Sequence, residues 1–205
     1  DHYANIAAAL DSPAVSDYEC QLARAESEID NIRAALAWCL EHANTEFALT
    51  LTSSLLPLWW TRGHHREAAA WFEAALADDL EHAVPTATRA RALADKAFLD
   101  MWTDPDASFD QAHTALTIAR EADDPAILLR ALATLFFIVG YGYDAAAEQY
   151  VAEAIELARA VGDRWRLGQI LTRAAGIAVA TGDPIAAQAF ATEGNELADA
   201  IGDRA

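Results

Sequence analysis

Positive charge is scarce in this sequence of 205 residues. Lysine and arginine together number 14 against 32 aspartates and glutamates, and the formal net charge is −18. Such a chain repels polyanions and has few cations to displace counterions from phosphate. We therefore expect no direct contact of this chain with nucleic acid. Lysine occurs once, at Lys96; it follows Asp95 rather than a glycine, which excludes a phosphate-binding P-loop.

Cysteines and long apolar runs are also sparse. Cys20 and Cys39 would stand about 28 Å apart on one continuous helix, too far to form a disulfide. Two buried, reduced thiols indicate a cytoplasmic protein. The longest uncharged run, 47–61, is interrupted by Pro57 and is shorter than the roughly 18 residues of a membrane span. We expect neither a membrane segment nor a secretory leader, since residue 1 begins within an amphipathic pattern.

What the sequence has in abundance is alanine arranged in repeats. The octet LARAVGDR (157–164) returns as LADAIGDR (197–204), and IAREADDP (118–125) is an earlier, weaker copy. Breaks recur about every 39 to 41 residues, at Asn44, Pro85, Asp124, Asp163 and Asp203. Each unit is divided once more, at Gly63, Asp104, Gly140–Gly142 and Gly182. Units of this length with one internal turn are typical of stacked helix pairs.

We predict an all-α fold, a right-handed superhelix of antiparallel helix pairs that forms a tetratricopeptide-like α-solenoid with a repeat of about 39–40 residues. Residues 1–43 are expected to form N-terminal helices leading into the array, with one long helix over 18–42. Residues 44–205 are expected to form four helix pairs, within one structural domain overall. The array is expected to continue beyond 205, because Asp203 begins another unit.

Local signals at the breaks support the helix pairs. Asp124-Pro125 and Asp183-Pro184 place an N-cap carboxylate before a first-turn proline. Gly162-Asp163 and Gly202-Asp203 place a left-handed C-cap glycine before the next N-cap. Pro57 is expected to kink its helix near Ser53 and Ser54, because it removes a backbone donor.

Motifs for catalysis or metal binding are missing. His64 and His65 with Glu67 lack the spacing that puts two imidazoles on one helix face, and we interpret them as a solvent-facing helix start. The carboxylates around Asp104 lack the glycine and the glutamate of a calcium loop, so we interpret them as a capped turn. No serine lies in a nucleophile-elbow motif. We expect no enzyme activity, no metal and no cofactor.

Two stretches resemble a known family. EIDNIRAALAWCLEH (28–42) and LLPLWWTRGHHREAAAWFEAAL (55–76) are similar to the tetratricopeptide-like region of large bacterial signal-transduction ATPases. These are LuxR-type transcriptional regulators and their relatives, some of them actinobacterial and fused to an adenylate-cyclase domain. The resemblance implies a regulatory segment that follows an ATPase module and often precedes a DNA-binding helix-turn-helix. The repeat here is longer than the roughly 34 residues of tetratricopeptides. We therefore expect longer helices, with groove positions shifted by up to one turn from those of tetratricopeptides.

In a tetratricopeptide register, the first helix of each pair lines the concave face. That register predicts a ligand or partner groove lined by Ser53, Trp60, Arg91, Phe98, Trp102, Arg130, Thr134, Phe137, Gln169 and Thr172. Such a lining of aromatic, arginine and amide side chains suits a peptide segment or a small organic ligand. Arg91 and Arg130 either bind a carboxylate or phosphate of the partner, or form ion pairs with neighbouring acidic residues.

Two functions of different kinds stay open. The first is a non-catalytic sensor and scaffold of a larger transcription-regulating ATPase, which binds a protein or peptide partner or a small-molecule inducer on its concave face. The alternative is a freestanding adaptor that joins proteins or self-associates, for example as a homodimer. A catalytic domain is the third and weakest hypothesis.

Overall fold

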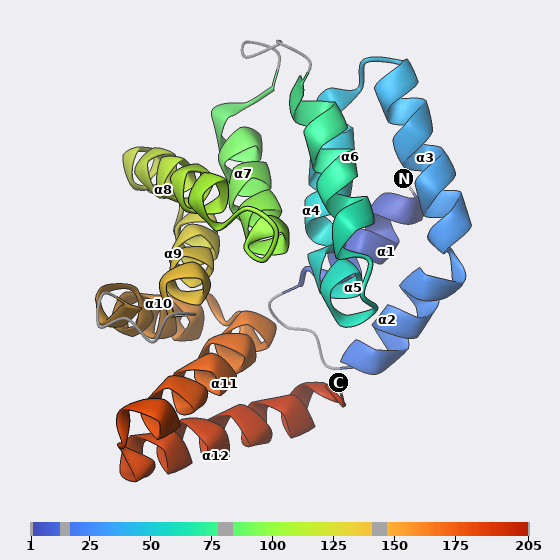
Figure 1. Ribbon diagram of the computed structural model, residues 1–205. Coiled ribbons are helices and arrows are strands. Elements are labelled where there is room, and N and C mark those ends of the chain that lie inside the picture. Colours follow the sequence, from blue (N-terminus) through green and yellow to red (C-terminus); the bar gives the residue numbers. More distant parts are fainter. Residues whose placement is uncertain (1, 13–16, 78–83, 141–146, 205) are drawn as a thin grey trace.

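The chain folds into an array of α-helices (Figure 1). The structure is a computed structural model and describes residues 2–12, 17–77, 84–140 and 147–204. No strand occurs within these ranges, which confirms the all-α prediction. The helices are α1 (His2–Leu10), α2 (Tyr18–Ser27), α3 (Ile29–Glu41), α4 (Thr45–Ser54), α5 (Leu56–Thr61), α6 (His65–Ala77), α7 (Thr86–Asp100), α8 (Pro105–Ala122), α9 (Pro125–Gly140), α10 (Glu148–Val161), α11 (Arg164–Thr181) and α12 (Pro184–Ile201).

Capping residues set the helix ends as the sequence predicts. The side chains of Asp104, Asp163 and Asp183 accept hydrogen bonds from backbone N–H groups in the first turns of α8, α11 and α12. Asp124 does the same at the start of α9. The C-cap glycines of α10, α11 and α12 are left-handed, with Gly182 at a φ of 82°. Of the break predicted at Gly140–Gly142, the last two residues lie outside the described ranges.

The single long helix predicted over 18–42 is wrong. The chain breaks at Glu28 (φ −101°, ψ 9°), and α2 and α3 run in different directions (Figure 1). Ser27 Oγ donates to the carbonyl of Arg24 at 2.7 Å, a local bond of the kind that competes with helix continuation. Cys20 is exposed on α2 while Cys39 is buried on α3, so the prediction of two buried thiols holds for Cys39 alone.

The kink predicted at Pro57 is present. Helix α4 ends at Ser54 and α5 begins at Leu56, so the chain changes helix at Leu55. Pro57 has no N–H to donate to the Ser53 carbonyl one turn earlier. The indole Nε1 of buried Trp59 donates to the neighbouring Thr52 carbonyl at 3.0 Å, which joins the end of α4 to α5.

The array curls until its two ends meet. Figure 1 shows the end of α12 beside α2. Tyr18, at the start of α2, stacks on Trp165 of α11 with ring centroids 6.3 Å apart and 26° between the planes. Tyr18 is fully buried and Ile201 is 2% exposed, so both belong to the core. Core side chains therefore fill the inner face of the array around this contact.

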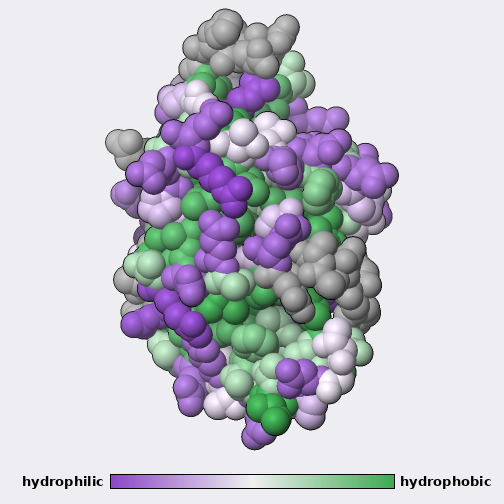
Figure 2. All heavy atoms as spheres, turned by 90° about the vertical axis from the view of Figure 1, so that its left-hand side faces the viewer, coloured by the Kyte–Doolittle hydropathy of each residue, from purple (hydrophilic) through white to green (hydrophobic). Residues whose placement is uncertain are grey.

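Hydrophobic residues reach the surface at a few points outside this core. Figure 2 shows the left-hand face of Figure 1, on which hydrophobic residues are exposed between hydrophilic ones. Near the turn from α11 to α12, Val179 is 69% exposed and Ile185 is 82% exposed. None of the described helices is both long enough and apolar enough to cross a bilayer.

Candidate functional site

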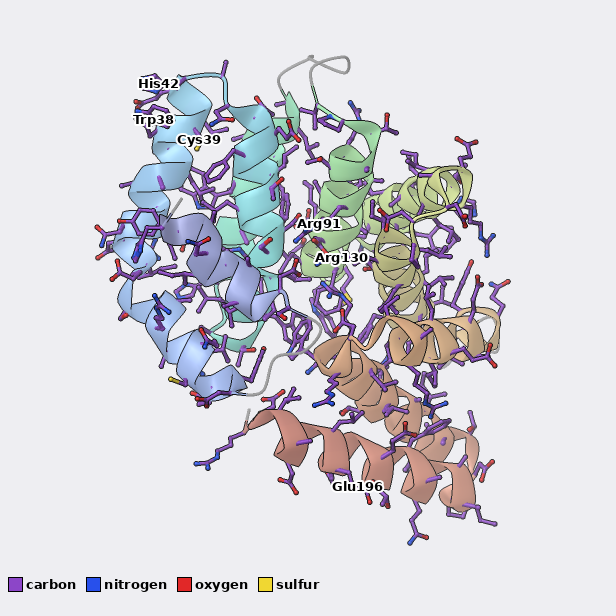
Figure 3. The ribbon with its side chains drawn as sticks, turned by 180° about the vertical axis from the view of Figure 1, so that it is seen from behind. Trp38, Cys39, His42, Arg91, Arg130 and Glu196 are labelled. Atoms are coloured by element: carbon purple, nitrogen blue, oxygen red, sulfur yellow. The ribbon has the colours of Figure 1, made fainter. Side chains whose placement is uncertain are left out.

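Three arginines from three successive helix pairs point into the centre of the array. Arg91 lies on α7, Arg130 on α9 and Arg166 on α11, in each case on the first helix of its pair. We call these three residues the arginine cluster. Figure 3 shows Arg91 and Arg130 side by side in the middle of the molecule. Arg130 is 6% exposed and Arg166 is 7% exposed, which is unusual for a charged side chain and requires partners.

Asp11, just beyond the end of α1, joins two members of the arginine cluster. Its Oδ2 accepts a hydrogen bond from Arg91 Nη2 at 2.7 Å, and its Oδ1 accepts one from Arg130 Nη2. Burial raises the pKa of Asp11, but the guanidinium groups of the arginine cluster outweigh it and hold that pKa below its ordinary value. Asp11 is therefore an ionised carboxylate at neutral pH, held between two different helix pairs.

Asp95 supplies the second carboxylate, from α7. Both of its oxygens accept from Arg130 Nη1, at 2.8 and 2.7 Å, and Asp95 is 1% exposed. Burial lowers the pKa of Arg130, but Asp95 and then Asp11 raise it above its ordinary value overall. For Arg91, burial and then the like charge of Arg130 lower the pKa to about 10. The positive charge at Arg91 is thus less well compensated than that at Arg130.

Arg166 has its own partner, Asp163. Arg166 Nη1 donates to Asp163 Oδ2 at 2.6 Å, while Oδ1 caps the first turn of α11 by accepting from the Arg166 backbone N–H. The guanidinium carbon lies 5.6 Å from the ring centroid of Trp165, within the range of a cation–π contact. Its Nη2 is buried and has no hydrogen-bond partner among the described residues.

A cavity of about 430 Å³ opens beside the arginine cluster. All three arginines line it, and so do Asp11 and Asp163. An apolar wall completes the cavity, formed by Ala87, Ala126, Ile127, Leu129 and Val161. A smaller void of about 20 Å³ shares Arg130 and Arg166 with it and is bordered by buried aromatic residues. A volume of several hundred Å³ with mostly apolar walls and a few polar groups is typical of small-molecule sites.

The structure brings most of the predicted groove residues together, although few of them face open space. Arg91 and Arg130 line the cavity, and Arg130 also borders the smaller void. The other predicted residues that border this void are Phe98, Thr134, Phe137 and Gln169. Trp60 contacts Phe98 with ring centroids 4.6 Å apart and 51° between the planes, and the Phe98 and Phe137 ring centroids are 5.2 Å apart. These side chains therefore lie close together, and they pack against one another around the smaller void.

Three predicted groove residues lie elsewhere. Ser53 is buried in α4, and it is absent from the lining of both the cavity and the smaller void. Trp102 is 46% exposed beyond the end of α7 and lines a separate cavity of about 520 Å³ with His65. Thr172 is exposed on α11. These positions are therefore not part of the site.

Sequence reasoning missed Asp11, Asp95, Asp163 and Arg166. Asp95 lies one helical turn after Arg91, and Arg166 lies one turn before Gln169, so helical spacing could have found both. Asp163 was interpreted as a helix cap alone, although its second oxygen binds Arg166. Nothing local indicates Asp11, because its partner Arg130 is 119 positions away.

The other candidate residues are structural. His65 stacks on Trp60 with centroids 5.0 Å apart and bonds to its carbonyl at 3.0 Å, while His64 lies 3.6 Å from Glu67. Both histidines are half-buried rather than solvent-facing. Asp104 caps α8, as the sequence predicts. Within the described ranges, no group of three or more His, Cys, Asp or Glu side chains could hold a metal ion.

Comparison with known proteins places the chain next to bacterial regulators. It is 50% identical over 192 residues to proteins of Mycobacterium tuberculosis (strains CDC 1551 and H37Rv) and Mycobacterium bovis. Their assigned names describe them as HTH-type transcriptional regulators. The match covers 90% of this chain and 22% of each relative, so the chain spans about a fifth of their length.

The chain was also compared with protein-family models and with solved structures. No family model matches the chain. The crystal structure of BtubC (BKLC) from P. vanneervenii aligns over 91% of this chain and 93% of its own, with a TM-score of 0.46 and 16% identity.

Proposed function

We propose that this chain is a non-catalytic sensor and scaffold segment of a transcription regulator. The observation that carries the proposal is the cavity at the centre of the curled array, where α7, α9 and α11 each contribute a buried or half-buried arginine. A ligand bound there would contact three helix pairs at once. Such a ligand could change how the pairs stack, because each pair of a helical array is stabilised mainly by its neighbours.

The relatives support a regulatory role. Their names describe HTH-type transcriptional regulators, and they match this chain along 90% of its length. The net charge of −18 and the lack of a P-loop lysine argue that this segment neither contacts DNA nor hydrolyses ATP. In our proposal, other parts of such a regulator would perform those tasks. A LuxR-type ATPase is the arrangement we favour, on the resemblance carried by 28–42 and 55–76.

Transcript profiling tests this proposal. Disruption of the coding sequence in its host is expected to change the transcript levels of a discrete set of genes. Re-expression of the intact sequence is expected to restore them. Unchanged transcript levels across growth conditions would contradict a regulatory role. As a second measurement, the purified chain is expected not to shift DNA in an electrophoretic assay.

An adaptor that binds proteins is the alternative, and the surface of α3 favours it. Trp38 is 53% exposed and stacks on His42 with centroids 4.3 Å apart. Beside them lies a cavity of about 420 Å³ with Tyr3 and Phe47 in its wall, at the outer edge of the molecule (Figure 3). Exposed tryptophan is enriched in interface hot spots. Analytical ultracentrifugation tests self-association. A dimer that the Trp38→Ala substitution abolishes would support the adaptor, and a monomer at high concentration would argue against self-association.

A further inference from the structure

The arginine cluster already holds a carboxylate that comes from outside the helices on which it lies. Asp95 belongs to α7 and Asp163 caps α11, so both are fixed within the array. Asp11 instead comes from the segment that follows α1. Its carboxylate bridges Arg91 on α7 and Arg130 on α9.

Donor groups in the cluster exceed the acceptors that the chain offers them. Arg166 Nη2 and Arg91 Nε are both buried and have no hydrogen-bond partner among the described residues. Arg166 lines the cavity and is only 7% exposed. A buried guanidinium N–H without an acceptor is costly, so an acceptor brought into this cavity would be stabilising.

The charge of the cluster fits a ligand with one negative charge. With Asp11 in place, three arginines face three aspartates: Asp11, Asp95 and Asp163. Once Asp11 leaves, the arginine cluster keeps only Asp95 and Asp163 as bonded carboxylates. The remaining carboxylate on the wall, Asp124, accepts backbone hydrogen bonds at the start of α9.

We propose that this cavity binds a small organic carboxylate, and that Asp11 occupies the carboxylate position when the ligand is absent. The proposal rests on the sensor function proposed above and names its ligand class. The carboxylate of the ligand binds between Arg91 and Arg130 as Asp11 does. Because it is not tethered to the backbone as Asp11 is, it lies closer to Arg166 and also accepts from Nη2. Its apolar body lies against Ile127, Leu129 and Val161.

A carboxylate fits better than a phosphate for two reasons. The two arginines already bind the two oxygens of a carboxylate, one oxygen each. A phosphate monoester carries nearly two negative charges at neutral pH, against the single charge of the Asp11 carboxylate that it would replace. It would also face Asp95, Asp163 and Asp124 in or beside the cavity.

Binding would also release the N-terminal segment. Asp11 is the residue after α1, and its bonds to Arg91 and Arg130 fasten this segment to the second and third helix pairs. Replacement of the Asp11 carboxylate by that of the ligand removes those bonds and leaves the number of carboxylates at the arginine cluster unchanged. The ligand would thereby loosen α1 from α7 and α9, which gives the site a structural output.

Chemical rescue of an Asp11 variant tests the assignment. The thermal midpoints of wild type, Asp11→Ala and Glu196→Ala are measured at about pH 7 and equal ionic strength in chloride, acetate, butyrate, benzoate or phosphate. Glu196 is the matched control, since it is an exposed carboxylate on α12, far from the cluster (Figure 3). Asp11→Ala is expected to lose about 5 °C in chloride and to regain at least about half of it in tens of millimolar carboxylate, most in butyrate or benzoate. Glu196→Ala is expected to respond to the anions as wild type does.

Each other outcome overturns the proposal. If acetate and the longer acids stabilise Asp11→Ala no more than Glu196→Ala, the cavity is not a carboxylate site. Rescue by phosphate alone would assign the cavity to phosphates. Rescue that survives in Asp11→Ala with Arg166→Met would exclude Arg166 as a ligand. If Asp11→Ala does not fold, Asp11→Asn enters the same series, since it removes the charge and keeps the side-chain volume.

This test is separate from that of the regulatory role. Transcripts that change on disruption, without rescue by carboxylates, would leave the sensor function standing and reject the ligand class. Rescue of Asp11→Ala by carboxylates, without any change in transcripts on disruption, would support the ligand class and reject the regulatory role.

Discussion

Asp11 and Arg130 are 119 positions apart in the sequence and form an ion pair in the centre of the molecule. The same arginine binds Asp95, so one buried guanidinium connects the N-terminal segment, α7 and α9. Contacts of this range are unusual in helical arrays, in which each repeat normally touches only its neighbours. The pair therefore marks the site at which distant parts of the chain depend on one another.

Replacement of Arg130 is expected to be strongly destabilising. Arg130→Met removes the hydrogen-bond donor of the buried Asp95 and leaves only the longer ion pair with Arg91 at 4.0 Å. It should lower the free energy of unfolding by about 3–5 kcal/mol. Arg159→Met is the control, since Arg159 is 51% exposed in its pair with Glu193 and should cost less than about 1 kcal/mol. Urea unfolding measures both. Equal losses for the two variants would show that the cluster contributes no more than a surface ion pair.

The contribution of Asp11 is expected to depend on pH in acid. The pKa of Asp11 in the folded state is below its ordinary value, because the guanidinium groups on α7, α9 and α11 outweigh the effect of burial. A lowered carboxyl pKa gives stability that is fully present above the unfolded pKa of about 3.9 and is lost as pH falls through the folded pKa. The difference in unfolding free energy between wild type and Asp11→Asn should stay constant from about pH 7 to 5 and shrink below about pH 4. A difference that grows in acid would contradict this ion pair.

Two glycines of α11 are expected to respond oppositely to alanine. Gly182 has a φ of 82° as the C-cap, where a β-carbon is strained, so Gly182→Ala should cost about 1 kcal/mol. Gly176 lies within the same helix, and an added β-carbon there meets nothing within 4 Å among the described residues. Gly176→Ala should therefore stabilise by up to about 1 kcal/mol. Thermal unfolding of the two variants measures both changes in stability. A change in the same direction for both variants would contradict a helix end at Gly182.

Local features of the fold could be predicted from the sequence, and closure of the array could not. The Gly-Asp and Asp-Pro breaks act on their own backbone neighbours, so their spacing gave the helix pairs and the register that brings Trp60, Phe98 and Phe137 together. The break at Glu28 was missed, because the apolar stripe continues across it. The closing contacts join residues that no repeat relates, so nothing in the period indicated them.

Loss of the closing aromatic contact is expected to open the array. Trp165 is 6% exposed and stacks on Tyr18, so Trp165→Ala should cost about 3–5 kcal/mol and increase the radius of gyration. Val179→Ala, at a residue that is 69% exposed, is the control and should change neither quantity by much. Small-angle X-ray scattering with circular dichroism measures both. A folded Trp165→Ala chain with an unchanged radius would show that other contacts close the array.

The central claim is that the cavity beside the arginine cluster controls a transcription regulator and that Asp11 holds it in the ligand-free state. The most direct measurement is transcript profiling of host strains that carry Asp11→Ala or Glu196→Ala in the coding sequence. We predict that Asp11→Ala changes the levels of the same set of transcripts as disruption of the coding sequence does, whether those levels rise or fall. Glu196→Ala should leave them at wild-type levels. Wild-type transcript levels in the Asp11→Ala strain, with the variant protein present at normal abundance, would contradict it.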